Sequence, residues 1–527
     1  MPLPDRNIPW PPKETERPRA LYDEWGAWYG GDPDELVRVY RGSAGGIDLK
    51  THPWQYSGGV RGAVGRLFWG APPTDGQQPT RLHVPLASDI ASVNADLLYA
   101  EPPSLAIAGD AGEDDPTQQR LDILLTAMHS ALIEGAEICS PYGGVFQRLS
   151  WNTDVADHII MEPIVPDCAA PEWAGQYLTA VTFWRVLSDE DGRVWRHLER
   201  HEPGRVYHGL YQGTEDKLGR QMALADHPGT ERFAQLVDSQ GGVTTGAKGL
   251  AAEYFPNMRP NRIMRGSPLG RSDYQGVVPL FDSLDETWSA LAREIRLAKA
   301  RMVVPDSFLD NLGRGQGQTF DVDREIYKGV SGMLQQSGQG MQDLIQLIQP
   351  AIRIEEHLSG AQALAEQIVR GAGFSAQTFG EGPSDVNVTA TEVQHRERRT
   401  FSTRSRKLGY QTGPLKRISR AALEMDAHVF PGHGIRPQPV MVQWPDGVQD
   451  APEATARTVQ LWAGAQAAST EIRVRAIHPD WHDQQVNDEV ARIQAENPVV
   501  DPFVAAGIIP GQGEGADEDP PAPEEGD

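Results

Sequence analysis

The sequence predicts a multi-domain protein of the α+β class, and three observations support this. The chain has 527 residues, which at about 150 residues per domain corresponds to three or four domains. Up to about residue 255, helical spacing of apolar residues alternates with runs of β-branched and aromatic residues that are typical of strands. Beyond that point, two long helical patterns flank a glycine-rich segment, which indicates helices that pack lengthwise on neighbours.

Composition excludes several classes of protein. Lys and Arg number 48 and Asp and Glu number 73, which gives a formal net charge of −25. Such a chain does not coat nucleic acid or an anionic membrane by bulk charge. No run of about 18 apolar residues occurs, so we expect no membrane span. The two cysteines, Cys139 and Cys168, cannot staple a chain of this size, and we expect two free thiols in a reducing compartment.

Both ends of the chain are expected to be loose. Five prolines among the first twelve residues prevent an early helix, so residues 1–20 are expected to form a loose N-terminal arm. The segment from Gly511 to Asp527 carries seven acids and no base. It cannot bury enough apolar surface to offset the entropy of ordering, and we expect it to be disordered.

The first half is predicted to contain three helices and three strands. Helical spacing from Leu21 to Tyr29 is followed by Gly30-Gly31, which is a stop signal. We expect helices at residues 21–30, 88–98 and 121–133, the third ending near Gly135. Strand patterns occur at residues 145–151, 178–187 and 194–201.

The second half is predicted to be mainly helical. Apolar residues recur every three or four positions from Val277 towards Pro305, which predicts a helix of about 29 residues because proline cannot continue it. A second pattern begins at Ile354 and ends at Gly371. Thr389 and Glu392 have capping-box spacing, and the helix that they open is expected to run to about residue 425 with a kink at Gly413-Pro414. A strand at 440–444 and helices at 454–467 and 484–495 complete the expected elements.

Motifs for catalysis or for metal binding are not supported. The segment Gly241–Gly249 lacks the lysine position and the hydroxyl of a phosphate-binding loop, and we interpret it as a flexible surface loop. His478 and His482 lack a third metal ligand nearby. We therefore expect no catalytic residue, no metal site, no cofactor and no enzymatic activity.

Basic residues cluster in two places in this acidic chain. One interpretation is ion pairing within the chain or across an oligomer interface, which is favoured for any single residue. The other is contact with nucleic-acid phosphates. The two clusters are Arg293, Arg296, Lys299 and Arg301, and Arg396, Arg398, Arg399, Arg404, Arg406 and Lys407.

Two segments carry most of the similarity to a known family. Residues 261–285 contain Gly270-Arg271-Ser272-Asp273 before a long helix with an acidic, leucine-bearing start. Residues 388–393 contain Thr389, Thr391 and Glu392 at the start of another long helix that follows a glycine-rich loop. Weaker similarities lie at residues 28–31, 94–102 and 208–219. In this order the segments resemble the portal proteins of tailed bacteriophages, which are head-to-tail connectors.

The resemblance implies a portal-like fold whose parts can be assigned to this chain. They are an N-terminal arm (1–20), a mixed α/β wing (21–255), the descending helix of a long antiparallel stem (256–302), a small inserted clip (303–350), the ascending stem helix (351–373), a tunnel loop (374–388), a long kinked wing helix with a wing strand (389–445), a helical crown (446–500) and an acidic disordered tail (501–527).

The resemblance also implies roles for individual residues. Arg293, Arg296 and Lys299 are expected to guide DNA in a channel or to pair across an interface, and we favour an interface for Arg301 and for the bases from Arg396 to Lys407. The tunnel loop is expected to present Ser384, Asp385, Val386, Asn387 and Val388 to DNA. The expected subunit interface consists of Leu284, Trp288, Leu291, Ile295, Leu358, Leu364, Arg396 and Arg399.

The implied function is a ring of about twelve copies at one vertex of the capsid, assembled in the host cytoplasm and retained in the virion. Double-stranded DNA would pass through it during genome packaging and ejection. The implied partners are other copies of the chain, this DNA, the terminase large subunit, a head-tail adaptor, and capsid and scaffold proteins, with no membrane. Two alternatives remain open: another virion structural or minor head protein without a pore, and an unrecognised hydrolase.

Overall fold

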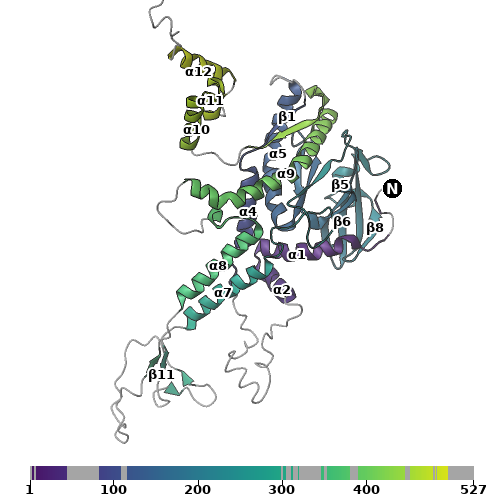
Figure 1. Ribbon diagram of the computed structural model, residues 1–527. Coiled ribbons are helices and arrows are strands. Elements are labelled where there is room, and N and C mark those ends of the chain that lie inside the picture. The colour runs from purple at the N-terminus through teal and green to yellow at the C-terminus, as the bar shows by residue number, and fades with distance from the viewer. Residues whose placement is uncertain are drawn as a thin grey trace, which may run out of the picture. The chain divides into compact units, whose positions relative to one another are not determined.

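The computed structural model describes residues 3–4, 7–43, 82–108, 115–297, 301–303, 310–311, 318–319, 346–348, 353–379, 390–445, 452–478, 481 and 483–496. The chain divides into two compact units, Met1–Pro445 and Asp446–Asp527. Helices and several sheets occur together (Figure 1), which confirms the α+β class.

Two antiparallel sheets form much of the first unit. The larger is a meander of β4 (Ala169–Ala174), β5 (Tyr177–Glu190), β6 (Arg193–Glu202), β7 (Arg205–Thr214) and β8 (Lys217–Met222), with β9 (Gly242–Thr244) paired to β7. The smaller has the order β10 (Ala252–Pro256), β2 (Gly144–Ser150), β3 (Ile160–Ile164). The three predicted strands are confirmed as β2, β5 and β6.

Four helices and several short turns accompany these sheets. They are α1 (Glu16–Gly30), α2 (Pro33–Ser43), α4 (Leu86–Tyr99) and α5 (Pro116–Tyr142), with the short pieces η1 (Lys13–Thr15), η3 (Pro166–Cys168), η4 (Leu224–Asp226) and α6 (Glu231–Ala234). The predictions for α1 and α4 are confirmed, and α2 was not predicted.

The helix α5 is longer than its apolar pattern predicted. Gly135 does not end it, because this glycine serves close packing: a Cβ there would lie 2.1 Å from Nε2 of Gln147 on β2. By length and composition α5 is the one described helix that could cross a membrane. Leu121, Leu124 and Met128 are fully buried in the main hydrophobic cluster, so here α5 is a core helix.

The next two helices form an antiparallel pair. They are α7 (Val278–Leu297) and α8 (Ile354–Ala372), which run side by side in Figure 1. At one end Arg353 contacts Glu294 at 2.5 Å, and at the other a Cβ on Gly371 would lie 2.3 Å from Val277. The expected end of α8 is confirmed.

The predicted 29-residue helix is wrong in its last part. The strand β11 (Arg301–Val303) replaces the last expected turn and pairs with β14 (Gln346–Ile348). Met302 and the two valines after it favour a strand, and a short apolar run fits either spacing. The short strands β12 (Asp310–Asn311) and β13 (Gln318–Thr319) pair with each other. No further part of the expected clip lies within the described residues.

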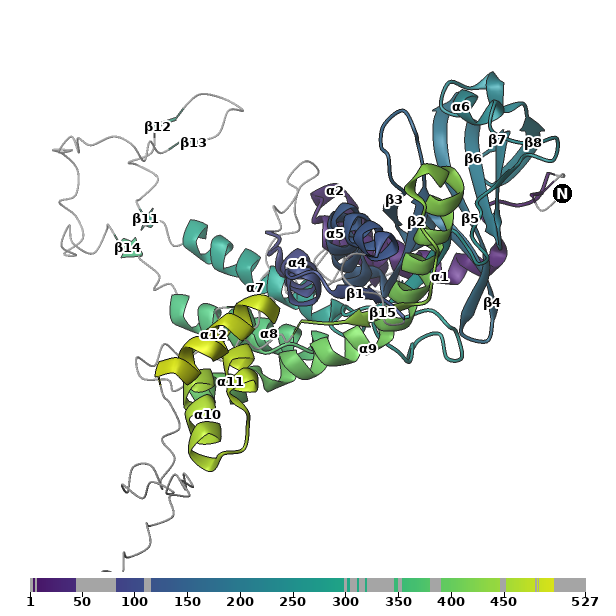
Figure 2. The same ribbon diagram turned by 90° about the horizontal axis from the view of Figure 1, so that it is seen from above.

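A helix of 40 residues, α9 (Ala390–Val429), crosses the unit with Pro414 inside it. Its axis bends partway along in Figures 1 and 2, as expected for an internal proline. The turn η7 (Ala376–Phe379) precedes it and η8 (Pro431–His433) follows it. The strand β15 (Val440–Gln443) was predicted, whereas its partner β1 (Ser104–Ile107) was not.

The second unit contains α10 (Pro452–Ala465), α11 (Thr470–Ile477) and α12 (Asp483–Glu496). The first and last were predicted. α11 was not, although Ser469 caps it by accepting a hydrogen bond from the backbone N–H of Ile472. His478 follows this helix and stacks on Trp481 at 3.9 Å between ring centroids, and His482 lies outside the described residues.

The start of the chain is packed, so the expectation of a loose arm is wrong for its described residues. Leu3 and Trp10 are buried, and Trp10 meets Trp184 edge to face at 5.2 Å. Pro9 bridges to Lys217 at the free edge of β8. Prolines prevent a helix here, but they permit this extended segment to cover the edge of the sheet.

The segment Gly241–Gly249 also differs from the prediction of a flexible surface loop. Its first residues form β9, and Thr245 is fully buried. The backbone N–H of Lys248 donates to Glu424 on α9 at 2.7 Å. This segment therefore connects the large sheet with α9.

We predict that Trp10→Ala lowers the free energy of unfolding by about 3–5 kcal/mol, because it removes a buried aromatic ring. Urea unfolding followed by circular dichroism measures the loss. Tyr177→Ala is the matched control, since that ring is 65% exposed. Equal stability of the two variants would show that the first residues do not support the sheet.

Candidate functional site

The Gly270–Asp273 motif lies against the end of α5. Gly143 follows that helix with a positive φ of 77°, and a Cβ on Gly270 would lie only 1.9 Å from its carbonyl oxygen. A Cβ on Gly143 would in turn lie 2.8 Å from the backbone nitrogen of Ser272. Two glycines are therefore needed for the motif to approach α5 this closely.

The motif places the Asp273 carboxylate in the interior of the protein. The Ser272 hydroxyl accepts a hydrogen bond from the backbone N–H of Tyr274 at 3.0 Å, which fixes the turn. The backbone N–H of Asp273 donates to the Ser140 carbonyl, and the Ser140 hydroxyl donates to Oδ2 of Asp273 at 2.8 Å. Asp273 is 4% exposed, so its charge requires a close partner.

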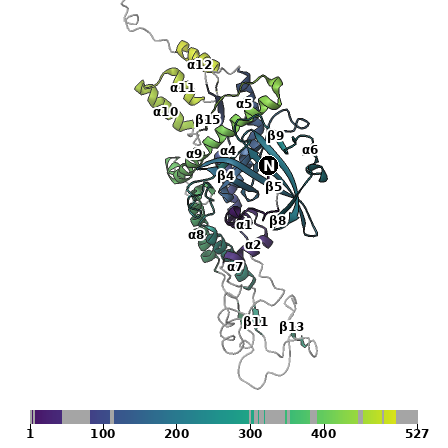
Figure 3. The same cartoon turned by 90° about the vertical axis from the view of Figure 1, so that its right-hand side faces the viewer.

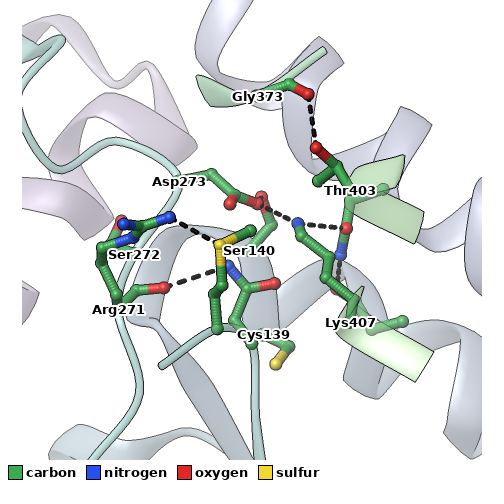
Figure 4. A network of polar contacts seen from close by, with 12 residues as sticks. Cys139, Ser140, Arg271, Ser272, Asp273, Gly373, Thr403 and Lys407 are labelled. Atoms are coloured by element: carbon green, nitrogen blue, oxygen red, sulfur yellow. Dashed lines mark hydrogen bonds and ion pairs between the residues drawn. The ribbon is translucent and has the colours of Figure 1, made fainter. Parts of the chain in front are cut away.

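That partner is Lys407, which points from α9 towards the motif (Figure 4). Its ammonium group is buried and donates to Asp273 at 2.5 Å and to Oδ1 of Asn94 on α4 at 2.6 Å. The Phe374 ring lies 5.1 Å from the same nitrogen, within the range of a cation–π contact. Lys407 therefore connects three parts of the chain. These are α4, the Gly270–Asp273 motif that precedes α7, and α9 itself.

The neighbouring turns of α9 are tied to the end of α8. The Thr403 hydroxyl donates to the Gly373 carbonyl at 2.7 Å, and the Thr400 hydroxyl accepts from the backbone N–H of Ser375 at 2.9 Å. Arg399 donates to the Arg370 carbonyl at 2.7 Å. The first half of α9 is thus attached to both helices of the antiparallel pair.

Two more ion pairs attach the second half of α9. Arg417 bonds Glu253 on β10 through two nitrogens, at 2.8 and 3.0 Å. Arg120 on α5 forms a buried pair with Asp426 at 2.8 Å. These contacts make α9 a rigid link between the sheets and the antiparallel pair.

The polar groups of this site are used by contacts within the chain. The Ser140 hydroxyl is buried and donates to the Asp273 carboxylate. Burial raises the pKa of the Cys139 thiol well above its usual range, so the thiol stays protonated and unreactive. The second cysteine, Cys168, is also unbridged.

The apolar residues expected at a subunit interface divide into two groups. Leu284 and Leu291 are buried inside the chain, and Trp288 and Leu364 are partly buried against the hydrophobic cluster that contains Leu284. These four stabilise the helix pair of their own chain and have little surface to offer a neighbour. Ile295 and Leu358 are 50% and 43% exposed and remain available.

The basic residues expected at an interface or channel also fall into different groups. Lys407 is buried, and Arg404 donates to the carbonyls of Leu97 and Pro445, so both serve the interior of the chain. Arg293 is exposed. Arg301 lies in β11 instead of the expected helix. For several residues no side chain is described: these are Arg296, Arg301 and Arg396, and the motif residues Thr391 and Glu392 of α9.

Lys299, Thr389 and the tunnel-loop residues Ser384, Asp385, Val386, Asn387 and Val388 lie outside the described residues. Their expected roles therefore remain predictions. Of the candidate residues, the structure brings together the Gly270–Asp273 motif and Lys407, which the sequence had placed in separate groups.

The spacing of residues along α9 could have identified Lys407 as a buried residue. Thr400, Thr403, Lys407 and Gln411 are all buried, and they follow one another at steps of three and four residues on one face of α9. A lysine within a stripe of uncharged residues is a candidate for burial with a partner.

One group of side chains has the composition of a metal site but the geometry of a hydrogen-bonded pair. Nε2 of His197 lies 3.2 Å from Nδ1 of His208, and the rings are 9° from parallel with centroids 5.3 Å apart. These two nitrogens are joined by a hydrogen bond, which uses the N–H of one ring and the lone pair of the other. Glu199 is already bound by Arg148 at 2.9 Å and by His201 at 2.7 Å.

This pair makes the sheet sensitive to acid. Burial lowers the pKa of His197 to about 3 and that of His208 to about 4. Both values lie below that of an exposed histidine, so the unfolded chain binds more protons as the pH falls below about 6.5. We predict that the free energy of unfolding falls by about 2–4 kcal/mol between pH 7 and pH 5.

Urea unfolding across this pH range measures the effect. His208→Phe should flatten the pH dependence, because one buried titrating group is removed. His478→Asn, at an exposed histidine, should leave it unchanged. A His208→Phe variant with the original pH dependence would contradict the assignment.

We predict that Lys407→Met lowers the free energy of unfolding by about 3–5 kcal/mol, because it leaves the Asp273 charge buried without its partner. Asp273→Asn should have a similar effect. The double variant should lose much less than the sum of the two, as expected for a coupled pair. Urea unfolding measures all three.

Arg406→Met is the matched control, because that side chain lies one residue away and is exposed. Strictly additive losses in the double variant would show that Lys407 and Asp273 do not depend on each other.

Comparison with known proteins places these features in a family. The family described as phage portal protein, SPP1 Gp6-like, matches residues 74–498. No curated protein sequence matches the chain. Solved structures that match include the neck of a native GTA particle computed with C12 symmetry and the neck of an empty GTA particle computed with C6 symmetry.

The first of these is 11% identical over 77% of this chain and 89% of the other, with a TM-score of 0.37. The second is 12% identical over 77% of this chain and 95% of the other, with a TM-score of 0.39. The family match covers most of the chain, including the Gly270–Asp273 motif, both helices of the antiparallel pair and α9. The chain therefore belongs to the phage portal protein family.

Proposed function

We propose that the chain forms a closed ring of about twelve copies at one vertex of a phage capsid, and that double-stranded DNA passes through the ring during packaging and ejection. The observation that carries this proposal is the family match over residues 74–498. A ring follows from head-to-tail contacts that close by rotation. In this role the chain is a structural component of the virion and not an enzyme.

The surface of the helix pair supports association of copies. Ile295 on α7 and Ile354 and Leu358 on α8 are 50%, 45% and 43% exposed, and they lie in the parts of these helices nearest to the segment between them. Burying such side chains against a neighbouring copy is favourable by about 25 cal/mol per Å² of apolar surface. We assign the pair to the stem of the ring.

Charge supports a conduit rather than a DNA-binding protein. Each copy carries a formal net charge of −25, so a ring of such copies has an acidic wall overall. Affinity for DNA rises with each basic contact to a phosphate. A wall with few such contacts lets DNA slide, and an exposed base such as Arg293 serves as an isolated guide or as an interface partner.

The link formed by α9 supports a role for the segment before it. Residues 380–389 join η7 to α9, and α9 is fixed to the motif by Lys407 and to the end of α8 by Thr403. We assign this segment, with Ser384 to Val388, to the tunnel loop that touches DNA. Displacement of the loop would be carried to the stem through these contacts.

The remaining partners are assigned to other surfaces in the same proposal. The segment between α7 and α8 would be the clip that docks the terminase large subunit and later the head-tail adaptor. The outer sheets would face capsid and scaffold proteins. Ring assembly would take place in the host cytoplasm.

We predict that replacing Val386 and Val388 by aspartate leaves ring assembly intact and reduces DNA packaging at least about tenfold, because added negative charge in the channel repels phosphates. Mass photometry of the purified protein should give a particle of about 0.7 MDa, as expected for twelve chains of 57.8 kDa. Packaging is measured as nuclease-protected DNA in an assembly reaction.

Val155→Asp is the matched control, because this valine is 74% exposed and far along the chain from the loop. Normal packaging by the loop variant would remove the tunnel-loop assignment. A wild-type protein that stays monomeric under assembly conditions would overturn the ring itself.

A further inference from the structure

A pocket lies between the start of α1, the strand β4 and the loop before the Gly270–Asp273 motif. It has a volume of about 380 Å³, which is near the lower end of the range for ligand pockets and suits one large side chain rather than a whole cofactor. In Figures 2 and 3, β4 lies at the outer edge of the large sheet and beside α1. We call this cavity the α1–β4 pocket.

The floor of the α1–β4 pocket is apolar. Phe146 on β2 is fully buried there. Trp173 on β4 and Leu269 in the loop also line the pocket, and both are partly buried against the hydrophobic cluster that contains Phe146. An apolar side chain that entered from a partner would remove its own surface and part of this floor from water, which favours binding.

The rim of the α1–β4 pocket is basic. Arg17 and Arg265 line it and are exposed. Arg19 also lines it, and Nε of this arginine is buried without a hydrogen-bond partner among the described residues. The lining residues that the structure describes include one carboxylate, that of Glu14. The rim therefore carries more positive than negative charge.

The local contacts of these arginines leave that charge in place. Arg17 donates to the Ile263 carbonyl at 3.4 Å, which does not neutralise a guanidinium group. Burial raises the pKa of Asp167, and the charge of Arg19 is among the interactions that oppose this rise, so Arg19 is partly neutralised from below. Arg265 has no hydrogen bond or ion pair to any residue that the structure describes.

The sequence of the loop has the same sign of charge. Residues 254–272 contain four arginines and no acid, although the whole chain has a formal net charge of −25. The planar guanidinium group of arginine binds a carboxylate through two parallel hydrogen bonds. The pocket thus combines an apolar floor with groups that bind carboxylates at its rim.

The loop that forms one wall is held in place by its own contacts. Oδ1 of Asn261 accepts from the backbone N–H of Met264 at 2.8 Å, and Nδ2 donates to the Gly270 carbonyl at 2.7 Å. Arg259 donates to the Pro268 carbonyl at 2.6 Å. The wall is therefore preformed, and binding does not require this loop to become ordered.

The sheet edge beside the pocket is poorly suited to strand addition. Among the described strands, β4 pairs with β5 alone. Pro171 in β4 lines the pocket and has no N–H to donate, and a proline in an edge strand opposes pairing with a further strand. A partner at this edge is therefore held by side chains in the pocket and not by the backbone of β4.

We propose that the α1–β4 pocket binds an acidic peptide segment of another protein of the particle. An aromatic or branched aliphatic side chain enters the pocket, and carboxylates on either side of it meet Arg17 and Arg265. This inference rests on the proposed function, in which the outer sheets face other proteins of the virion, and it names the chemistry of one such contact. DNA phosphates would use the arginines but would leave the apolar floor without a partner.

The test uses the full chain and a fluorescein-labelled synthetic peptide in which acidic residues flank a central p-benzoylphenylalanine. We expect the peptide to bind, and irradiation to attach it to pocket residues such as Met264 and Leu269, which mass spectrometry identifies. Glycine in place of the central aromatic residue should weaken binding at least about tenfold, because the floor then stays uncovered. Fluorescence anisotropy measures the affinity.

Arg17→Glu with Arg265→Glu should weaken binding of the same peptide at least about tenfold, because like charges then face each other. Both side chains are exposed, and thermal melting verifies that the variant folds. Arg193→Glu with Arg220→Glu is the matched control. It changes the net charge by the same amount at exposed positions of β6 and β8, and it should bind the peptide like wild type.

Four results would overturn the inference. Equal affinity of the wild type and the Arg17→Glu, Arg265→Glu chain, or cross-links outside the pocket, would show that the peptide does not bind here. Equal affinity for the glycine peptide would remove the role of the floor. A loss of affinity for a DNA duplex that exceeds the loss for the peptide would assign the rim to DNA. Loss of ring formation by the same chain in mass photometry would assign the pocket to a contact between copies.

Failure of the proposed function is measured separately, because mass photometry of the wild type requires no peptide. A wild-type chain that stays monomeric but binds the peptide would remove the ring and support the chemistry assigned to the pocket. A wild-type chain that forms the ring but does not bind the peptide would remove the inference alone.

Discussion

The buried ion pair between Lys407 and Asp273 is the contact on which the rest of the first unit depends. A charge of either sign in this position would be costly alone, so each residue fixes the place of the other. Lys407 also binds Asn94, and Asp273 immediately precedes the turn into α7. The helix pair, α4 and the long helix α9 therefore meet at this one ion pair.

The ion pair can form only because two backbone segments beside it approach each other closely. Gly143 and Gly270 face each other at distances that exclude any Cβ, and this brings the end of α5 against the motif. Ser140 on the last turn of α5 can then donate to Asp273. Replacing the ion pair by apolar side chains could be neutral for stability. The pair instead favours one arrangement of these helices, because any other arrangement would leave a buried charge without its partner.

Sequence patterns predicted the elements whose burial is periodic and local. The apolar stripe of α8 and the β-branched and aromatic runs of β5 and β6 predicted these elements directly, because the neighbours that cover them require no particular partner residue. The end of α5 was misplaced, since Gly135 has a packing role that spacing does not reveal. The site was predicted only in part. The motif was recognised, but Lys407 was grouped with the bases expected at a subunit interface, because Asp273 lies 134 residues away and no local pattern joins them.

The charged contacts buried within this chain fix the relative positions of its helices and sheets. Lys407–Asp273 and Arg120–Asp426 are sealed from water, so they are little affected by salt and hold one chain in one shape. A charge on the surface keeps its water until a partner covers it, so the cost of removing that water arises only when the contact forms. Rigidity within the chain therefore follows from burial, whereas exposed charges remain subject to screening by salt.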